Sequence, residues 1–286
     1  MQGAISLKRF ARNAWPVLVS AVKKFFDDRC IITAQALTYT TIFSLIPALV
    51  LAFSVFQTFG GIESIEPLLF QYLSEILAPG RQQIVLKSIE GLIQKAQESP
   101  IGVFSTFFFL VIAMLLLIEL EDSLNYIWRT KGHRAFGQRI TVYFAALTLA
   151  PVLIASPVLV GVFITSYDDS SIFFRYLPLV QLLRIAPIMS IWIFLFSIYF
   201  FLPNSDVKTD AAAIGTLAGG SLWLIAAKLY TIYTKNVFIY SMIYGSIGSI
   251  PVFLLWLFIS WAVILFGAEI SYSFQHRHSL TVVAAI

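Results

Sequence analysis

The chain contains several uninterrupted apolar stretches that are long enough to cross a lipid bilayer. A helix needs about 20 consecutive, mostly apolar residues to span the hydrocarbon core. The stretch Ile101–Leu120 is among the clearest, because a proline opens it and its first acidic residue is Glu119. Over the whole chain 59% of the residues are hydrophobic and 12% are charged, against about 25% charged in a typical soluble domain. The sequence therefore excludes an ordinary soluble enzyme and predicts an integral membrane protein.

Six such stretches predict an all-α fold, a polytopic membrane protein with six transmembrane helices. We expect a cytoplasmic amphipathic segment at residues 1–30, a six-helix membrane domain at 31–275 and a cytoplasmic tail at 276–286. The predicted spans are residues 35–59, 101–120, 140–166, 182–202, 211–234 and 250–274.

Two segments outside the spans have helical periodicity. Residues 15–29 have one apolar and one charged face, which is typical of a helix that lies in the membrane interface. Residues 62–98 contain two apolar stripes separated by Pro79-Gly80, which predict an outer helical hairpin between the first two spans. This hairpin either covers the outer mouth of the bundle or packs on the membrane surface. The apolar face of the first segment consists of Trp15, Leu18, Val19, Val22 and Phe26.

The basic residues predict the orientation of the chain. Twelve Lys and Arg residues fall on one side of the six predicted spans and five on the other. Because cytoplasmic loops are enriched in Lys and Arg, we expect both termini in the cytoplasm. A nucleic-acid partner is not expected, since binding would need a basic face on a soluble domain.

Polar residues in the apolar stretches are the candidate functional residues. A charge at the centre of a spanning helix costs about 2.5–3.5 kcal/mol, so such residues usually face a bundle interior or a wet cavity. Glu121 and Asn125 share a face at the end of the second stretch, Lys228 lies in the fifth and Glu269 in the sixth. Two simpler interpretations remain open: the second helix leaves the membrane near Glu121, and Lys228 extends its ammonium group to the interface.

The first and fifth spans add further candidates. Pro47 lies in the middle of the first span and kinks it, so Gln35 and Tyr39 could help to shape a substrate site there. A purely structural kink is the alternative. Gly215 and Gly219 form a GxxxG motif in the fifth span, which predicts close packing against a neighbouring helix.

No residue pattern indicates catalysis or metal binding. The three histidines lie in short cytoplasmic segments, and Cys30 is the single cysteine, which is expected to fill a small apolar space. The sequence has no HExxH, GxSxG or P-loop motif. We therefore expect no enzymatic activity, no cofactor and no metal site.

Several blocks of the chain, in this order and spacing, resemble the YihY/BrkB family of bacterial inner-membrane proteins, once labelled ribonuclease BN. The resemblance implies six transmembrane helices in the bacterial cytoplasmic membrane and no established substrate. Members of the family are usually described as transporters, with a suggested link to the export of envelope lipids. The resemblance implies that the nuclease label is a misassignment. The blocks are Ala34–Tyr39, Ser44–Pro47, Glu121–Arg129, Pro203-Asn204, Lys228 with Tyr230 and Tyr233, Tyr240–Gly245, Ile250-Pro251 and Gly267–Ile270.

Together the residues and the resemblance predict an inner-membrane transporter for a lipid or an envelope-related substrate. The alternative is a scaffold without transport activity that organises envelope proteins through its GxxxG face and its outer hairpin. The expected partners are membrane lipids and either a second copy of the chain or an envelope protein. An intramembrane hydrolase is disfavoured, because no nucleophile and base occur together.

Overall fold

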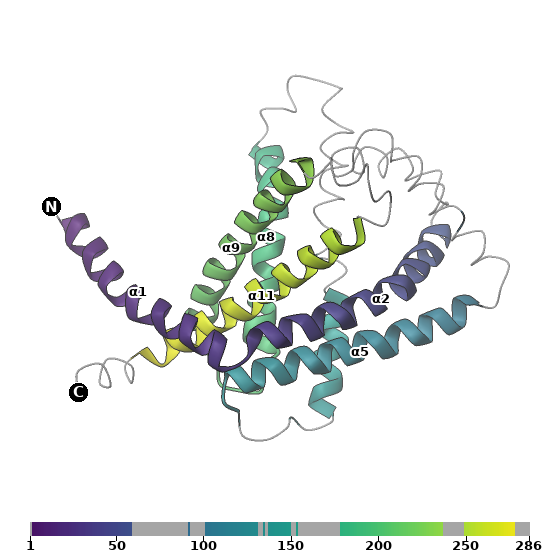
Figure 1. The fold of residues 1–286 in the computed structure, drawn as a ribbon, viewed down its shortest axis with the longest axis horizontal. Coiled ribbons are helices and arrows are strands. Elements are labelled where there is room, and N and C mark those ends of the chain that lie inside the picture. The colour runs from purple at the N-terminus through teal and green to yellow at the C-terminus, as the bar shows by residue number, and fades with distance from the viewer. Residues whose placement is uncertain are drawn as a thin grey trace. The chain divides into compact units, whose positions relative to one another are not determined.

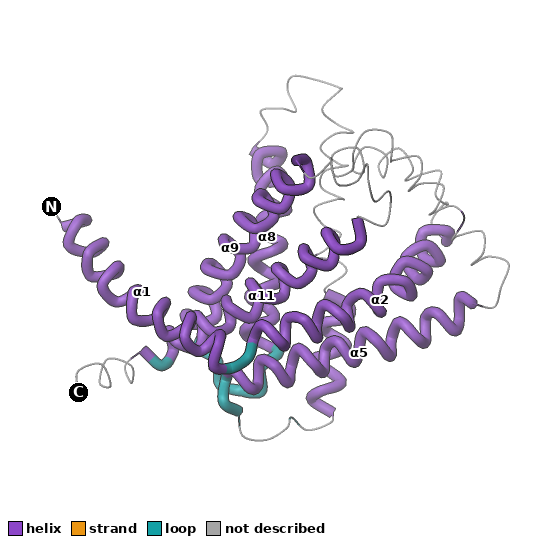
Figure 2. Tube along the Cα trace, in the orientation of Figure 1, coloured by secondary structure: helices purple, strands orange, loops and turns teal. Residues whose placement is uncertain are grey.

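The computed structural model describes residues 2–58, 91, 101–130, 134, 137–149, 153, 178–236 and 249–277. The described residues form α-helices with a few short turns and contain no strand, so the predicted all-α class is confirmed (Figures 1 and 2). The main helices are α1 (Gln2–Asp27), α2 (Cys30–Thr58), α5 (Ile101–Ile127), α8 (Pro178–Phe201), α9 (Thr209–Asn236) and α11 (Ser249–Gln275).

Five of the predicted spans coincide with α2, α5, α8, α9 and α11. Of the third predicted span, only residues 140–149 and 153 are described, and these are helical. The predicted hairpin at 62–98 lies outside the described residues, apart from Gly91. Among the described helices, Thr209–Thr234 and Pro251–Gln275 are long and apolar enough to cross a membrane. The six-span topology therefore stays a prediction.

Helices α2 and α5 extend furthest beyond the predicted spans. Helix α2 begins at Cys30, five residues before Gln35, and α5 continues past Leu120 to Ile127. The α5 extension carries polar side chains, which hydropathy alone assigns to the water phase, whereas the α2 extension, Cys30–Ala34, is largely apolar. In α5 the extension stays helical while the first of these polar residues, Glu121, is buried among partners.

Helix α1 is amphipathic, as the pattern at 15–29 predicts, but it starts much earlier and ends at Asp27. The predicted apolar face is exposed, with Trp15 at 67%. A different side of α1 packs on α11, where the Phe25 and Phe266 rings meet edge to face at 5.6 Å. Arg29 adopts a left-handed backbone conformation (φ 54°), which ends α1 and allows α2 to start at the next residue.

The chain divides into two compact units. Unit 1 comprises residues 1–35, 119–225 and 259–286, and unit 2 comprises 36–118 and 226–258. The described core of unit 1 contains large buried side chains from four helical segments, and in unit 2 the Tyr230 and Trp256 rings stack at 4.9 Å. The core residues of unit 1 include Leu124, Ile127, Tyr143, Leu195, Tyr199 and Leu265.

Helices α9 and α11 approach each other closely in unit 1 because glycines line their contact. A Cβ atom on Gly215 would lie 2.7 Å from the carbonyl oxygen of Gly267. The Tyr199 hydroxyl of α8 enters the same contact and donates a hydrogen bond to the carbonyl of Ile264 at 2.8 Å. A Cβ on Gly219 would lie 2.8 Å from this hydroxyl. The GxxxG motif thus packs inside the protein.

Candidate functional site

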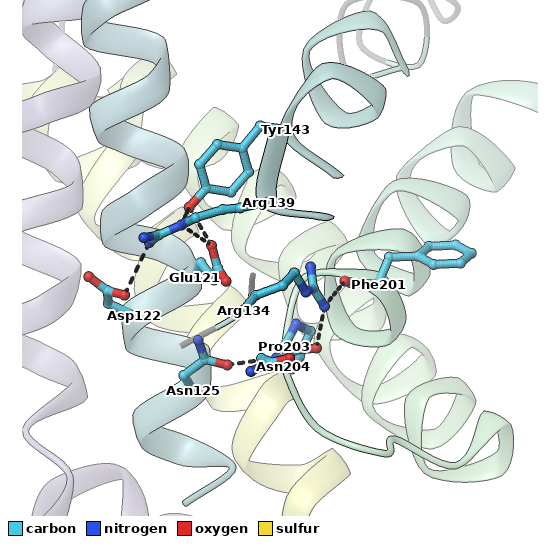
Figure 3. Close-up of polar contacts among 9 residues, drawn as sticks. All are labelled: Glu121, Asp122, Asn125, Arg134, Arg139, Tyr143, Phe201, Pro203 and Asn204. Atoms are coloured by element: carbon cyan, nitrogen blue, oxygen red, sulfur yellow. Dashed lines mark hydrogen bonds and ion pairs between the residues drawn. The ribbon is translucent and has the colours of Figure 1, made fainter. Parts of the chain in front are cut away.

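Unit 1 contains an ion cluster around a buried acid, which we call the Glu121 cluster: Glu121, Asp122, Arg139 and Tyr143 (Figure 3). Glu121 is 1% exposed. Its Oε2 accepts a hydrogen bond from Arg139 Nε at 3.0 Å and another from the Tyr143 hydroxyl. Arg139 also approaches Asp122 Oδ1 at 3.5 Å. Arg139 and Tyr143 are four residues apart in one helix, so their side chains reach the carboxylate together.

The Glu121 cluster stabilises an anion in an apolar surrounding. A buried charge is tolerated when it is paired and its remaining valences are hydrogen-bonded. Here one guanidinium and one phenol serve the same carboxylate oxygen. The cluster joins α5 to the helical residues 137–149 through an ion pair and a hydrogen bond, which is a structural contact.

A second set of contacts joins the end of α8 to neighbouring segments. Asn125 Oδ1 accepts a hydrogen bond from the backbone N–H of Asn204 at 2.7 Å. Arg134 Nη2 donates to the carbonyls of Phe201 (3.2 Å) and Pro203 (3.1 Å) (Figure 3). The last carbonyls of a helix lack intrahelical partners, so Arg134 caps α8. Asn125, predicted to contact a substrate, has a backbone partner in this structure.

A second buried cluster surrounds Glu269, which is 0% exposed on α11. We call Glu269, Asp28 and Cys30 the Glu269 cluster. The Cys30 thiol lies 3.7 Å from Glu269 Oε1 and donates to it. Asp28, in the link between α1 and α2, faces Glu269 closely enough for a side-chain hydrogen bond when one of the two acids carries a proton. Its Oδ1 pairs with Arg129 Nη2 at 2.7 Å.

Two cations lie next to the Glu269 cluster. Burial lowers the pKa of Lys24 below its usual value, although Glu269 and Asp28 oppose this shift. The Lys24 ammonium lies over the Tyr272 ring, 3.9 Å from its centroid. Burial opposes ionisation of Arg129 as well, but its hydrogen bond and charge interaction with Asp28 outweigh this effect and raise the pKa of Arg129.

Each acid of the Glu269 cluster has one oxygen without a partner. Asp28 Oδ2 and Glu269 Oε2 are buried and have no hydrogen-bond partner among the described residues. The opposite oxygens, Asp28 Oδ1 and Glu269 Oε1, are the ones that bind Arg129 and Cys30. Two carboxyl groups therefore meet in a buried place with one guanidinium in direct contact.

The other predicted site residues do not join either cluster. Gln35 is exposed on α2, and Tyr39 is 66% exposed, with its ring 4.6 Å from that of Phe43. Pro47 lies within α2, but its side chain is outside the described ones. Lys228 is exposed on α9, and no described acid pairs with it.

Sequence reasoning identified Glu121 and Glu269 but not their partners. Asp28 and Arg129 are 101 positions apart, and Cys30 and Glu269 are 239 apart. A helical pattern shows which residues share a face, but it does not show which helix that face meets. Cys30, expected to fill an apolar space, is buried but contacts a carboxyl group.

The described part of the chain is α-helical, has two helices apolar enough to cross a membrane and buries acidic side chains in its interior. The model of the family described as Virulence factor BrkB matches residues 21–284, so the chain belongs to this family.

Several relatives are named UPF0761 membrane protein. The protein from Aeromonas salmonicida is 30% identical over 265 residues, which cover 91% of this chain and 87% of the relative. The protein from Coxiella burnetii is 29% identical over 269 residues, covering 93% and 96%. That from Alcanivorax borkumensis is 30% identical over 257 residues, and the match covers 88% of this chain and 58% of the relative. No solved structure matches the chain.

Proposed function

We propose that this protein is a transporter of the bacterial inner membrane that translocates a lipid or an envelope-related substrate. The observation that carries the proposal is the burial of Glu269 on α11, a helix apolar enough to cross a membrane. Ionisable residues in such helices are costly and usually belong to substrate or ion pathways.

The surface of α9 supports a lipid substrate. Leu229 and Ile232 are exposed apolar side chains, which are typical of a helix in contact with lipid. Lys228 is exposed beside them, in unit 2. An ammonium group on a lipid-facing surface attracts the anionic headgroup of a lipid that crosses the bilayer. In this proposal Lys228 contacts the lipid headgroup, and Glu269 takes part in coupling.

The competing scaffold hypothesis has less support. It assigns the GxxxG face to partner proteins, but Gly215 and Gly219 pack against α11 and Tyr199 within unit 1. A partner could not bind these glycines without opening that contact. We further propose that the protein has no enzymatic activity, that it acts without a cofactor, and that its partners are lipids and a second copy or an envelope protein.

Lipid translocation in vesicles tests the proposal. The purified protein is reconstituted with fluorescent phospholipids, and an impermeant quencher is added from outside. Sealed, protein-free vesicles lose the half of the signal that lies in the outer leaflet, because headgroups do not cross an apolar barrier unaided. We expect a clear excess of quenching with the wild-type protein. Quenching equal to that of empty vesicles would contradict a lipid substrate.

Lys228→Ala tests the role of the exposed lysine in the same assay. We expect it to reduce the excess quenching, because the ammonium group is lost while no described contact changes. Lys208→Ala is the matched control, since Lys208 is also exposed but lies before α9 begins. Equal quenching by both variants and the wild type would remove Lys228 from the lipid path.

A further inference from the structure

The Glu269 cluster contains two buried carboxyl groups, and one described cation, Arg129, is in direct contact with them. Glu269 and Asp28 face each other, and the side chains are almost inaccessible to solvent. Arg129 binds Asp28 at 2.7 Å. No described cation lies within ion-pair distance of Glu269, although the Lys24 ammonium, which lies over the Tyr272 ring, is close enough to interact with its charge.

We propose that Glu269 and Asp28 share one proton, so that this buried carboxyl pair is a proton-binding site with a single negative charge. The unpartnered oxygens, Glu269 Oε2 and Asp28 Oδ2, are the atoms that such a proton would join. Glu269 then donates an O–H to the Asp28 carboxylate, and each acid has a partner on both of its oxygens. Arg129 balances the remaining charge. The proposal does not depend on transport.

The proton holds three separate segments together. Glu269 belongs to α11, Asp28 to the link between α1 and α2, and Arg129 to the turn after α5. When the proton leaves, two buried negative charges face each other, and like charges in a site of low polarity repel strongly. Deprotonation therefore weakens the attachment of the α1–α2 link to α11.

Of the neighbouring groups, Cys30 and Lys24 contribute to the pH dependence with opposite signs. Burial raises the pKa of the Cys30 thiol, so its contribution falls with rising pH, but only where the thiol of the unfolded chain ionises, above mildly alkaline pH. Lys24 from α1, Cys30 from α2, Arg129 from the turn after α5, and Tyr272 and His276 from α11 surround the pair or its immediate partners. Because the pKa of Lys24 is lowered in the folded protein, the unfolded chain binds more protons there, and this contribution to stability rises with pH. A proton held by the acid pair has the opposite sign, so its contribution falls as pH rises.

Infrared spectroscopy of the full-length protein in detergent detects the proton directly. We expect the carbonyl stretch of a protonated carboxyl group at neutral pH in the wild type, and its loss in Glu269→Gln. Glu121→Gln is the matched control: this acid is equally buried but is paired with Arg139, so its removal should leave the band unchanged. An unchanged band in Glu269→Gln, or loss of the band in Glu121→Gln, would overturn the proposal.

Thermal unfolding across the same pH range gives a second readout. We expect the melting temperature of the wild type to fall from neutral to mildly alkaline pH. The fall should disappear in Glu269→Gln, because an amide imitates the protonated acid. It should also disappear in Asp28→Asn, whose amide can donate to an ionised Glu269 and which serves if the first variant does not fold. A wild-type melting temperature independent of pH, or variants that fall like the wild type, would overturn the proposal.

Discussion

Glu121 and Asp122 are adjacent acids near the end of α5 that have very different surroundings. Glu121 ends an apolar stretch, and the simpler interpretation placed it where the helix meets water. The structure buries it and gives it Arg139 and Tyr143 as partners, while its neighbour Asp122 is 54% exposed on the side chain. Helix geometry separates the two acids, because adjacent residues point about 100° apart.

Removing the guanidinium from the Glu121 cluster should destabilise the protein. Arg139→Leu leaves a buried carboxylate with one hydroxyl donor, and breaking a buried ion pair costs about 3 kcal/mol at the lower end of the usual range. Chemical unfolding in detergent measures this difference. Asp122→Asn is the control, because it removes an exposed contact of the same arginine, worth about 0.5 kcal/mol. Equal losses from both changes would contradict the assignment.

At the scale of elements, the sequence gives the position of helices better than their neighbours. Hydropathy located α8, α9 and α11 to within a few residues, because a long apolar stretch is a strong signal. It missed the last residues of α5, where polar side chains continue the helix, and the first residues of α2, which directly follow the charged end of α1. The GxxxG motif predicted a close contact, but only the structure identifies α11 and Tyr199 as its partners.

Alanine in the contact between α9 and α11 should lower stability, and the clash should be specific. In Gly219→Ala the new methyl group meets the Tyr199 hydroxyl, and overpacking costs about 1–3 kcal/mol. Tyr199→Phe removes that oxygen, so the double variant should recover part of the loss. Gly137→Ala, with nothing near its Cβ position, should be neutral or slightly stabilising. Thermal unfolding of these four variants beside the wild type checks the prediction. A double variant less stable than either single variant would contradict it.

The exposed apolar face of α1 should lie in the membrane interface. Trp15 is exposed on the side of α1 that carries Leu18, Val22 and Phe26, and such faces bury themselves at the headgroup boundary. The fluorescence of Trp15 is obtained as the difference between the wild type and Trp15→Phe. We expect lipids brominated near the headgroup to quench this difference signal. Quenching of this difference signal only by a water-soluble quencher would show that α1 stays in solution.

At the scale of the whole molecule, the basic residues predict that both termini face the cytoplasm. Reporter fusions check this: a fluorescent protein that folds only in the cytoplasm should be active at either end, and a phosphatase that needs the periplasm should be inactive. The opposite pattern at one terminus would require an odd number of spans and would contradict the six-span prediction.

The proposed transport function depends on the buried carboxyl group of Glu269 on α11, a helix apolar enough to cross a membrane. The most direct measurement compares wild type, Glu269→Gln and Asp206→Asn in the vesicle assay, at equal amounts of reconstituted, folded protein. Asp206 is the control because its side chain is exposed. We expect the excess quenching to disappear in Glu269→Gln and to remain in Asp206→Asn. Undiminished translocation by Glu269→Gln would contradict it.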